Sequence, residues 1–298
     1  MSAVRKLSLT KSHWNRCLTS LILSVCLLSI CLGCQKKPPI DGETEQAPAE
    51  GEDQSASTPD EKAAKEKPID PKLVVKSGEP MTLERYKAVM PNLKQLGLSF
   101  HNLHEANKYF LPSPKEHPEY YDANGRLKVS WRVHLLPFLD QKELYGQFKL
   151  NEAWDSPHNA PLAKNMPDIF RSPDSPADST KTRFRVFECE REKGRNQLSS
   201  MFPLGTPSRI RDTLDGTSNT ILVVEVGPDQ AVEWTKPGGL SVAQPQEELG
   251  ATGTTVAVLR ADGSIALIKR DLDDRLWKGI VGPQDRIAFD WDRIKANP

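Results

Sequence analysis

The spacing of apolar residues early in the folded region predicts one long helix. Apolar side chains recur every three or four positions between Leu83 and Leu103, and Thr82 is a suitable N-cap residue before them. Pro91 lies inside this pattern. Because proline has no backbone N–H to donate, we expect it to kink the helix or to mark a new start.

The second half of the chain changes to a period of two, which predicts strands. Residues 183–187 alternate, residues 220–226 form the most apolar run, and residues 256–268 have the pattern of a hairpin with an Asp-Gly pair at its turn. Between the long helix and these strands, residues 130–148 predict two short helices with an apolar face.

The N-terminus has the pattern of an export signal. Basic residues precede an uncharged run from Cys17 to Gly33, and the run ends on a small residue. The run is also close to the lower limit of a membrane span, which is about 17 residues. Residues 1–33 therefore predict a cleaved signal peptide, with an uncleaved anchor as the alternative.

Residues 32–35, Leu-Gly-Cys-Gln, resemble the lipobox of bacterial lipoproteins, although Cys31 stands where an aliphatic residue is usual. The resemblance implies that Cys34 becomes the first mature residue and carries the lipid. Each acyl CH₂ that enters the bilayer contributes about 0.8 kcal/mol to such anchoring. The alternative is an ordinary cysteine of the signal. If Cys34 is lipidated, Cys189 is the only other cysteine of the mature chain, and no intramolecular disulfide can form.

A polar segment, residues 34–80, separates this signal from the folded region. Residues 35–80 contain seven prolines and no aromatic residue, and residues 41–70 contain ten acidic and three basic residues. Such a segment buries too little apolar surface to offset the entropy of ordering. We expect a disordered, acidic tether, followed by a folded domain over residues 81–298.

Charge and hydropathy exclude two classes of protein. The chain has 40 basic and 40 acidic residues, so it has no overall basic character for binding nucleic acid. A mean hydropathy of −0.54 excludes a multispanning membrane protein. The expected partners are the membrane, through the lipid anchor, and other envelope proteins.

Two groups of residues are candidates for binding. Trp131, Trp154 and Trp234 could form an exposed platform for a ligand, although tryptophans are more often core residues. Oxygen atoms of Asp212, Asp215 and Asn219 could hold a hard cation, although a turn explains their Asp-Gly-Thr-Ser-Asn context equally well.

Evidence for catalysis or a metal is weak. The sequence has no Gly-rich phosphate loop, G-x-S-x-G, H-E-x-x-H or paired C-x-x-C motif. His101 and His104 share a helix face without an evident third ligand, so we expect neither a metal site nor a cofactor. Glu225 lies in an apolar strand. We expect it to be partly buried and paired with an arginine such as Arg209 or Arg211.

Five blocks of the sequence lie in order within residues 85–270, at residues 92–102, 130–137, 151–159, 212–225 and 234–237. Together these blocks resemble a large planctomycete family of prepilin-like proteins that carry a domain of unknown function, the His-x9-Asp-Gly family. Two features depart from that family: the prepilin cleavage motif is missing, and residues 250–253 replace the segment that carries its histidine. The resemblance implies a pilin-like α+β fold, in which an N-terminal helix packs on an antiparallel sheet with short helices and long loops. It implies no established activity.

Together these features favour a non-enzymatic, lipid-anchored envelope protein with a structural or protein-interaction role, facing the periplasm or the cell surface. The alternative is an extracytoplasmic module that binds a solute or a glycan through the three tryptophans. A hydrolase of unrecognised type is a third hypothesis.

Overall fold

The computed structural model describes residues 68–190 and 199–298. The predicted signal, Cys34 and most of the predicted tether lie outside these residues. Within the described part of the chain, no helix is both long enough and apolar enough to cross a membrane.

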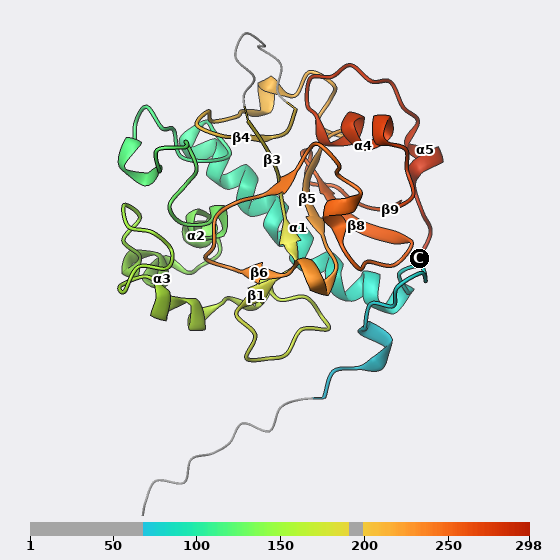
Figure 1. Ribbon diagram of the computed structural model, residues 1–298, viewed down its shortest axis with the longest axis horizontal. Coiled ribbons are helices and arrows are strands. Elements are labelled where there is room, and N and C mark those ends of the chain that lie inside the picture. Colours follow the sequence, from blue (N-terminus) through green and yellow to red (C-terminus); the bar gives the residue numbers. More distant parts are fainter. Residues whose placement is uncertain (1–67, 191–198) are drawn as a thin grey trace, which may run out of the picture. The chain divides into compact units, whose positions relative to one another are not determined.

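The predicted long helix is α1, Leu83–Asn107 (Figure 1). The Thr82 hydroxyl accepts a hydrogen bond from the Arg85 backbone N–H at 3.2 Å, which caps the first turn. Pro91 lies inside the helix and does not end it, so the predicted new start is wrong. The buried face continues past Pro91, and packing of this face stabilises the helix. The helix ends at Asn107, and the C-cap residue Lys108 adopts a left-handed conformation with φ 64°.

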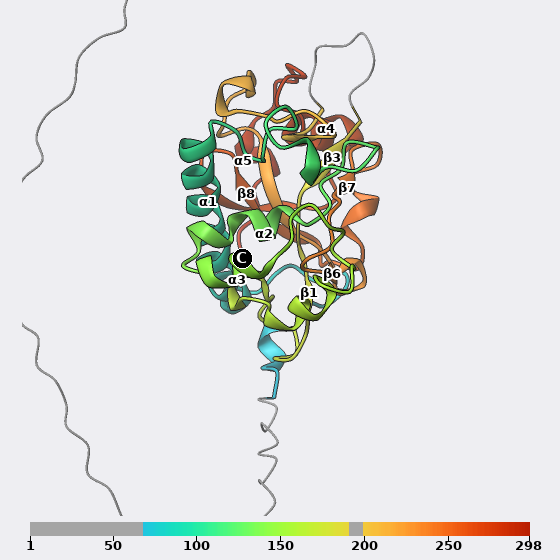
Figure 2. The same ribbon diagram turned by 90° about the vertical axis from the view of Figure 1, so that its left-hand side faces the viewer.

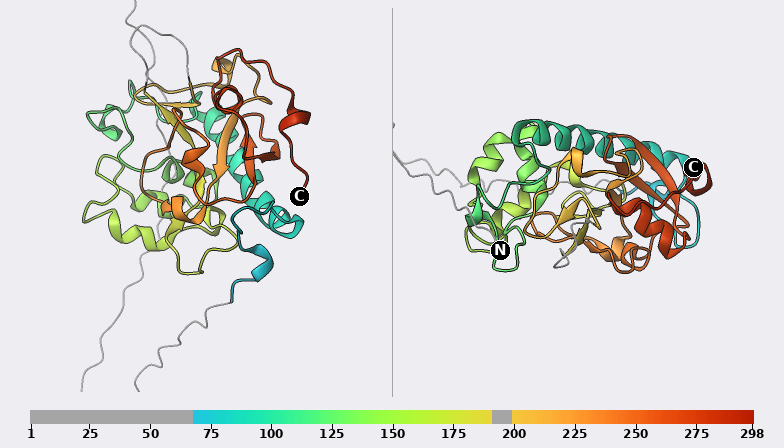
Figure 3. Two further views of the ribbon diagram at one scale, coloured as in Figure 1. Left: turned by 45° about the vertical axis from the view of Figure 1, so that its right-hand side comes forward. Right: turned by 90° about the horizontal axis from the view of Figure 1, so that it is seen from above.

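Helix α1 packs against a four-stranded antiparallel sheet. The strand order is β2-β5-β8-β9, with β2 at Phe184–Arg185, β5 at Ile221–Glu225, β8 at Thr255–Arg260 and β9 at Ile265–Lys269. Side chains alternate between the two faces of β8, so that Ala257 and Leu259 share a core with α1. Val256 and Val258 join the core of α4, Asp274–Val281. Figure 3 shows α1 on one side of these strands and α4 on the other.

Several shorter elements complete the body. A parallel sheet, β4-β3-β7, joins Phe202–Pro203, Phe187–Cys189 and Leu240–Ser241, while β1 at Lys181–Thr182 pairs with β6 at Val232–Glu233. Short helices are α2 at Trp131–Leu135, α3 at Lys142–Gln147 and α5 at Trp291–Ile294. The α+β class is confirmed, including a helix packed on an antiparallel sheet. The parallel pairs were not predicted, because strands of two or three residues show no period.

Residues 70–82, here called the strap, lie against the body ahead of α1. The strap contains a short 3-10 helix, Pro71–Leu73, and its Glu79 carbonyl accepts a hydrogen bond from Thr254 N at 2.8 Å. A Cβ added to Gly253 would lie 2.0 Å from the Glu79 carbonyl oxygen, so only glycine permits this approach. Packed structure therefore begins upstream of the predicted domain start at Met81.

Candidate functional site: a cavity over a buried ion network

Four charged side chains from separate segments meet beneath the strap. Arg85 of α1 contacts Glu225 of β5 at 2.6 Å and Asp174 at 2.9 Å, and Arg183 contacts Asp174 at 2.7 Å. All four side chains are at most 7% exposed. We call this group the ion network.

The ion network balances its own charge. Two guanidinium groups face two carboxylates, which offsets the large cost of removing ions from water. Burial acts to raise the pKa of Asp174, but Arg183 and Arg85 outweigh it and hold that pKa below its usual value. Arg183 Nε also donates to the Val226 carbonyl at 2.7 Å, which ties the network to the end of β5. The Asp174 carboxylate therefore stays ionised inside the fold.

The partner of Glu225 differs from the prediction. The expected burial of Glu225 is confirmed, since the residue is 2% exposed. Its partner is Arg85, whereas Arg209 pairs with Asp212 at 3.2 Å. Glu225 shares a face of β5 with Val223, and that face is directed toward α1. The predicted partner was wrong because it was chosen among arginines that lie close to Glu225 in the sequence.

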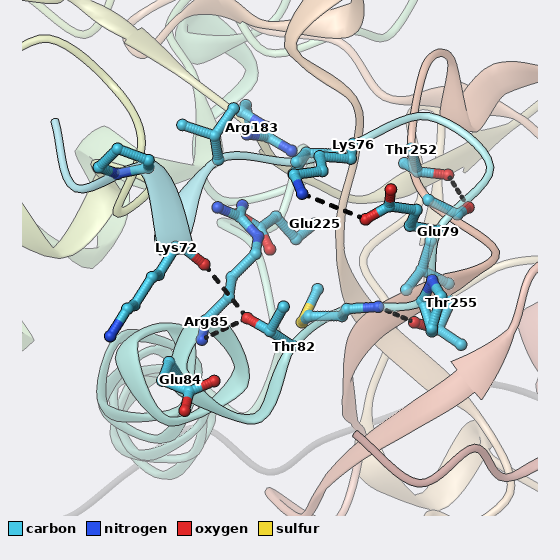
Figure 4. A pocket seen from close by; sticks show the side chains of 17 residues that line it. Lys72, Lys76, Glu79, Thr82, Glu84, Arg85, Arg183, Glu225, Thr252 and Thr255 are labelled. Carbon is cyan, nitrogen blue, oxygen red and sulfur yellow. Dashed lines mark hydrogen bonds and ion pairs between the residues drawn. The ribbon is translucent and has the colours of Figure 1, made fainter.

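A cavity of about 450 Å³ lies between the strap and the ion network. We call it the strap cavity. Figure 4 shows Arg85 and Glu225 together on its inner side, with Lys76 and Glu79 of the strap across from them. Its apolar wall comes from the strap and from β8; the residues are Val74, Val75, Pro80, Met81 and Val256. The strap cavity thus combines an apolar wall with charged groups.

Two polar atoms of the ion network have no partner within the described structure. Glu225 Oε2 and Arg85 Nε are both buried without a hydrogen bond. An unsatisfied buried polar atom costs about 1–3 kcal/mol, and more when it is charged. One atom is an acceptor and the other a donor, and both residues line the strap cavity. A ligand that reached these two atoms would need one donor and one acceptor.

The three candidate tryptophans do not form an exposed platform. Trp131 is 4% exposed, Trp234 is fully buried, and both rings contact Phe170 in the main core. Trp154 is half-buried, with the Lys236 ammonium 5.8 Å from its ring centroid. Trp131 and Trp234 are therefore core residues, and their rings are not available to a ligand at the surface.

The three candidate cation ligands make turn contacts instead. Asp212 Oδ2 accepts from Arg209 N at 2.9 Å, and the Asp215 carboxylate accepts from Arg286 N at 3.1 Å. Asn219 donates to the Asp215 carbonyl at 2.8 Å and accepts from the Trp291 indole at 2.8 Å. Among residues 68–190 and 199–298, no three His, Cys, Asp or Glu side chains are placed to hold a metal ion.

Asp285 beside this turn is expected to make stability depend on pH. Burial, together with the nearby Asp215 carboxylate, raises the pKa of Asp285 to about 6 from 3.8. The folded chain thus binds this proton more tightly than the unfolded chain does. The contribution of Asp285 to the free energy of unfolding is complete below about pH 3.8 and is lost as the pH rises through about 6. The free energy of unfolding, measured with urea at a series of pH values, should show this loss.

The Asp285→Asn variant should remove that component of the pH dependence. The exposed Asp155→Asn variant is the matched control and should keep the wild-type profile. An unchanged profile in Asp285→Asn would show that Asp285 does not titrate in this range.

The fold and the site define an α+β protein with a cavity above buried ions, and comparison with known proteins adds its family. A family model described as "Protein of unknown function (DUF1559)" matches residues 90–256. This match covers more than half of the 298 residues, and the chain belongs to that family. No curated protein and no solved structure matches significantly. The match includes Asp174, Arg183 and Glu225 but excludes the strap and Arg85.

Proposed function

We propose that the chain is a non-enzymatic, lipid-anchored envelope protein whose folded body binds a small solute in the strap cavity. The supporting observation is the strap cavity itself, which is lined by an apolar wall and by Glu225 and Arg85, each of which has a buried polar atom without a partner. Its volume lies in the range of about 300–1,000 Å³ that is typical of small-molecule sites. The sequence favoured a structural or protein-interaction role, and the strap cavity now favours the solute-binding alternative.

The lining of the strap cavity indicates the kind of solute. Glu225 Oε2 requires a hydrogen-bond donor and Arg85 Nε requires an acceptor. The four charges of the ion network cancel, and Lys76 pairs with Glu79 at the cavity wall, so most charges around the cavity are already paired with one another. Val74, Val75 and Val256 offer contact to an apolar group. We therefore propose a small, mainly apolar solute with a head group, such as an amide, that both donates and accepts.

The Val74→Trp variant should lose solute binding. Val74 is 43% exposed and lines the strap cavity, so a larger side chain can occupy the space without disturbing the core. Small molecules that copurify with the full chain are extracted, identified by mass spectrometry and added back. A solute that binds only the folded state raises the unfolding temperature of the wild type. We expect no rise in Val74→Trp.

Leu214→Trp is the matched control, because Leu214 is 63% exposed and does not line the strap cavity. It should respond to the solute as the wild type does. An equal rise in Val74→Trp would place the solute elsewhere on the molecule.

The anchoring part of the proposal has a separate test. Mass spectrometry of the mature N-terminus, purified from the host envelope, should detect acyl chains on Cys34 and no residues before it. The reason is the lipobox resemblance at residues 32–35, in which the small Gly33 precedes the cysteine. An unmodified Cys34, or a chain that still begins at Met1, would contradict lipid anchoring and would leave the solute proposal intact.

A further inference from the structure

A second hollow lies near the C-terminal end of α1, away from the strap. Helix α2 and the 3-10 helix after it, Leu136–Phe138, contact α1 in this part of the body, and Figure 2 shows α2 in front of the sheet with α1 at its side. The hollow has a volume of about 320 Å³ and is lined by residues of α1, of the segment before α2, of α2, of the 3-10 helix Leu136–Phe138 and of α3. We call it the His134 hollow. None of its lining residues also lines the strap cavity.

Aromatic rings form much of the wall of the His134 hollow. The His117 and Tyr120 rings are stacked, with centroids 4.8 Å apart and planes 5° apart. The Tyr120 ring lies 5.9 Å from that of His134, and Tyr145 and Phe138 also line the hollow. The stack covers one face of the His117 ring and one face of the Tyr120 ring, which leaves the opposite face of each ring for an apolar contact.

His134 is a buried polar group without a partner. The residue is 3% exposed, and its Nε2 atom makes no hydrogen bond to any described residue. Burial, with a smaller contribution from His117, lowers the pKa of His134 to about 3, so its ring is neutral near pH 7. A neutral imidazole offers one donor and one acceptor.

Other polar groups of the His134 hollow have no protein partner, although, unlike His134, they are exposed or partly exposed to solvent. The Asn107 amide and the hydroxyls of Tyr120 and Tyr145 line the hollow and form no side-chain hydrogen bond within the described part of the chain. Burial, with a smaller contribution from Tyr120, raises the pKa of Tyr145, which keeps its hydroxyl protonated as a donor. The hollow therefore combines aromatic faces with neutral donors and acceptors.

We propose that the His134 hollow binds a neutral saccharide ring. A saccharide has an apolar face of C–H groups, which suits the Tyr120 ring, and a rim of hydroxyls, which suits Asn107, His134 and Tyr145. Glu116 is the only acidic residue in the lining, and the lining contains no lysine or arginine, so an anionic ligand would find no fixed cation there. This site is separate from the strap cavity and does not depend on the solute proposed for it.

Saturation-transfer difference NMR tests the proposal with D-glucose and N-acetyl-D-glucosamine as probes. The full chain is kept in a detergent without sugar groups, so that the detergent cannot compete. We expect transfer to the ring protons of at least one probe. Tyr120→Ala should weaken that binding by about tenfold, because it removes the stacking face. Tyr145→Phe, which deletes only a hydroxyl, should weaken it less while the fold is kept.

Tyr109→Ala is the matched control, since Tyr109 is a partly exposed tyrosine outside the His134 hollow. It should bind the probe as the wild type does. Circular dichroism checks that each variant is folded. If Tyr120→Ala does not fold, the binding measured for Tyr145→Phe decides the result. Absence of transfer from both probes, or equal binding in the variants, would overturn the proposal. Displacement of the sugar by D-glucuronate, or binding of p-cresol in place of any sugar, would overturn the assigned ligand class.

Discussion

Arg85→Met is expected to lower the free energy of unfolding by about 3–5 kcal/mol, because it leaves a buried carboxylate without its counterion. The Glu225 side chain is 1% exposed, and Arg85 is its ion-pair partner. The same substitution removes one of the two arginines that contact Asp174. It also removes the hydrogen bond that Arg85 donates to the Leu73 carbonyl of the strap. Urea denaturation of the wild type and the variant measures the loss.

Two further variants make this result specific. Arg293→Met removes an exposed arginine that lies 3.9 Å from Asp290, and a pair of this kind contributes only about 0–1 kcal/mol. Arg85→Met combined with Glu225→Met should recover part of the loss, because no unpaired charge stays at the Glu225 position. A loss in Arg85→Met as small as that in Arg293→Met would contradict the role given to the ion network.

Trp234→Ala is expected to lower the free energy of unfolding by about 3–5 kcal/mol, the usual cost of replacing a buried aromatic residue by alanine. The Trp234 ring is fully buried and stacks on Phe170, with centroids 5.7 Å apart. Its edge-to-face contact with Phe148 has a centroid distance of 5.8 Å. Its indole N–H donates to the Ala163 carbonyl at 2.8 Å, and that acceptor would lose its partner. Thermal and urea unfolding measure the change.

Trp154→Ala is the comparison, because Trp154 is only half-buried and should cost less. If Trp234 belonged to a ligand platform, its substitution would reduce binding with little change in stability. A small loss in Trp234→Ala would therefore contradict its place in the core.

The regular part of the fold could be predicted because its residues carry a period. The helical spacing between Leu83 and Leu103 predicted α1, and the apolar run at 220–226 predicted β5. The Asp-Gly pair at residues 262–263 correctly placed the turn between β8 and β9. In each case a local pattern was sufficient, because the element buries one continuous face.

The strap could not be predicted from composition. Its charged residues and prolines match those of the preceding tether, yet backbone contacts such as Thr254 N to the Glu79 carbonyl hold it against the body. Hydrogen bonds of this kind leave no compositional signal. The apolar residues Leu73, Val74 and Val75 were the one local hint, because an apolar run is unusual in a disordered segment.

The ion network could not be predicted from the sequence for a different reason. Glu225 stood out as an acid in an apolar strand, but its partner Arg85 lies 140 positions away along the chain. Asp174 lies in an irregular segment without a motif. Only the packing of α1 on the sheet brings these side chains together, and the family match begins at residue 90, after Arg85.

The most direct test of the solute-binding proposal is a crystal structure of the full chain, purified from its host envelope without added ligand. We expect electron density for a molecule larger than water in the strap cavity, within hydrogen-bonding distance of the Glu225 carboxylate. A strap cavity that holds only water molecules, or that closes completely against the ion network, would contradict the proposal.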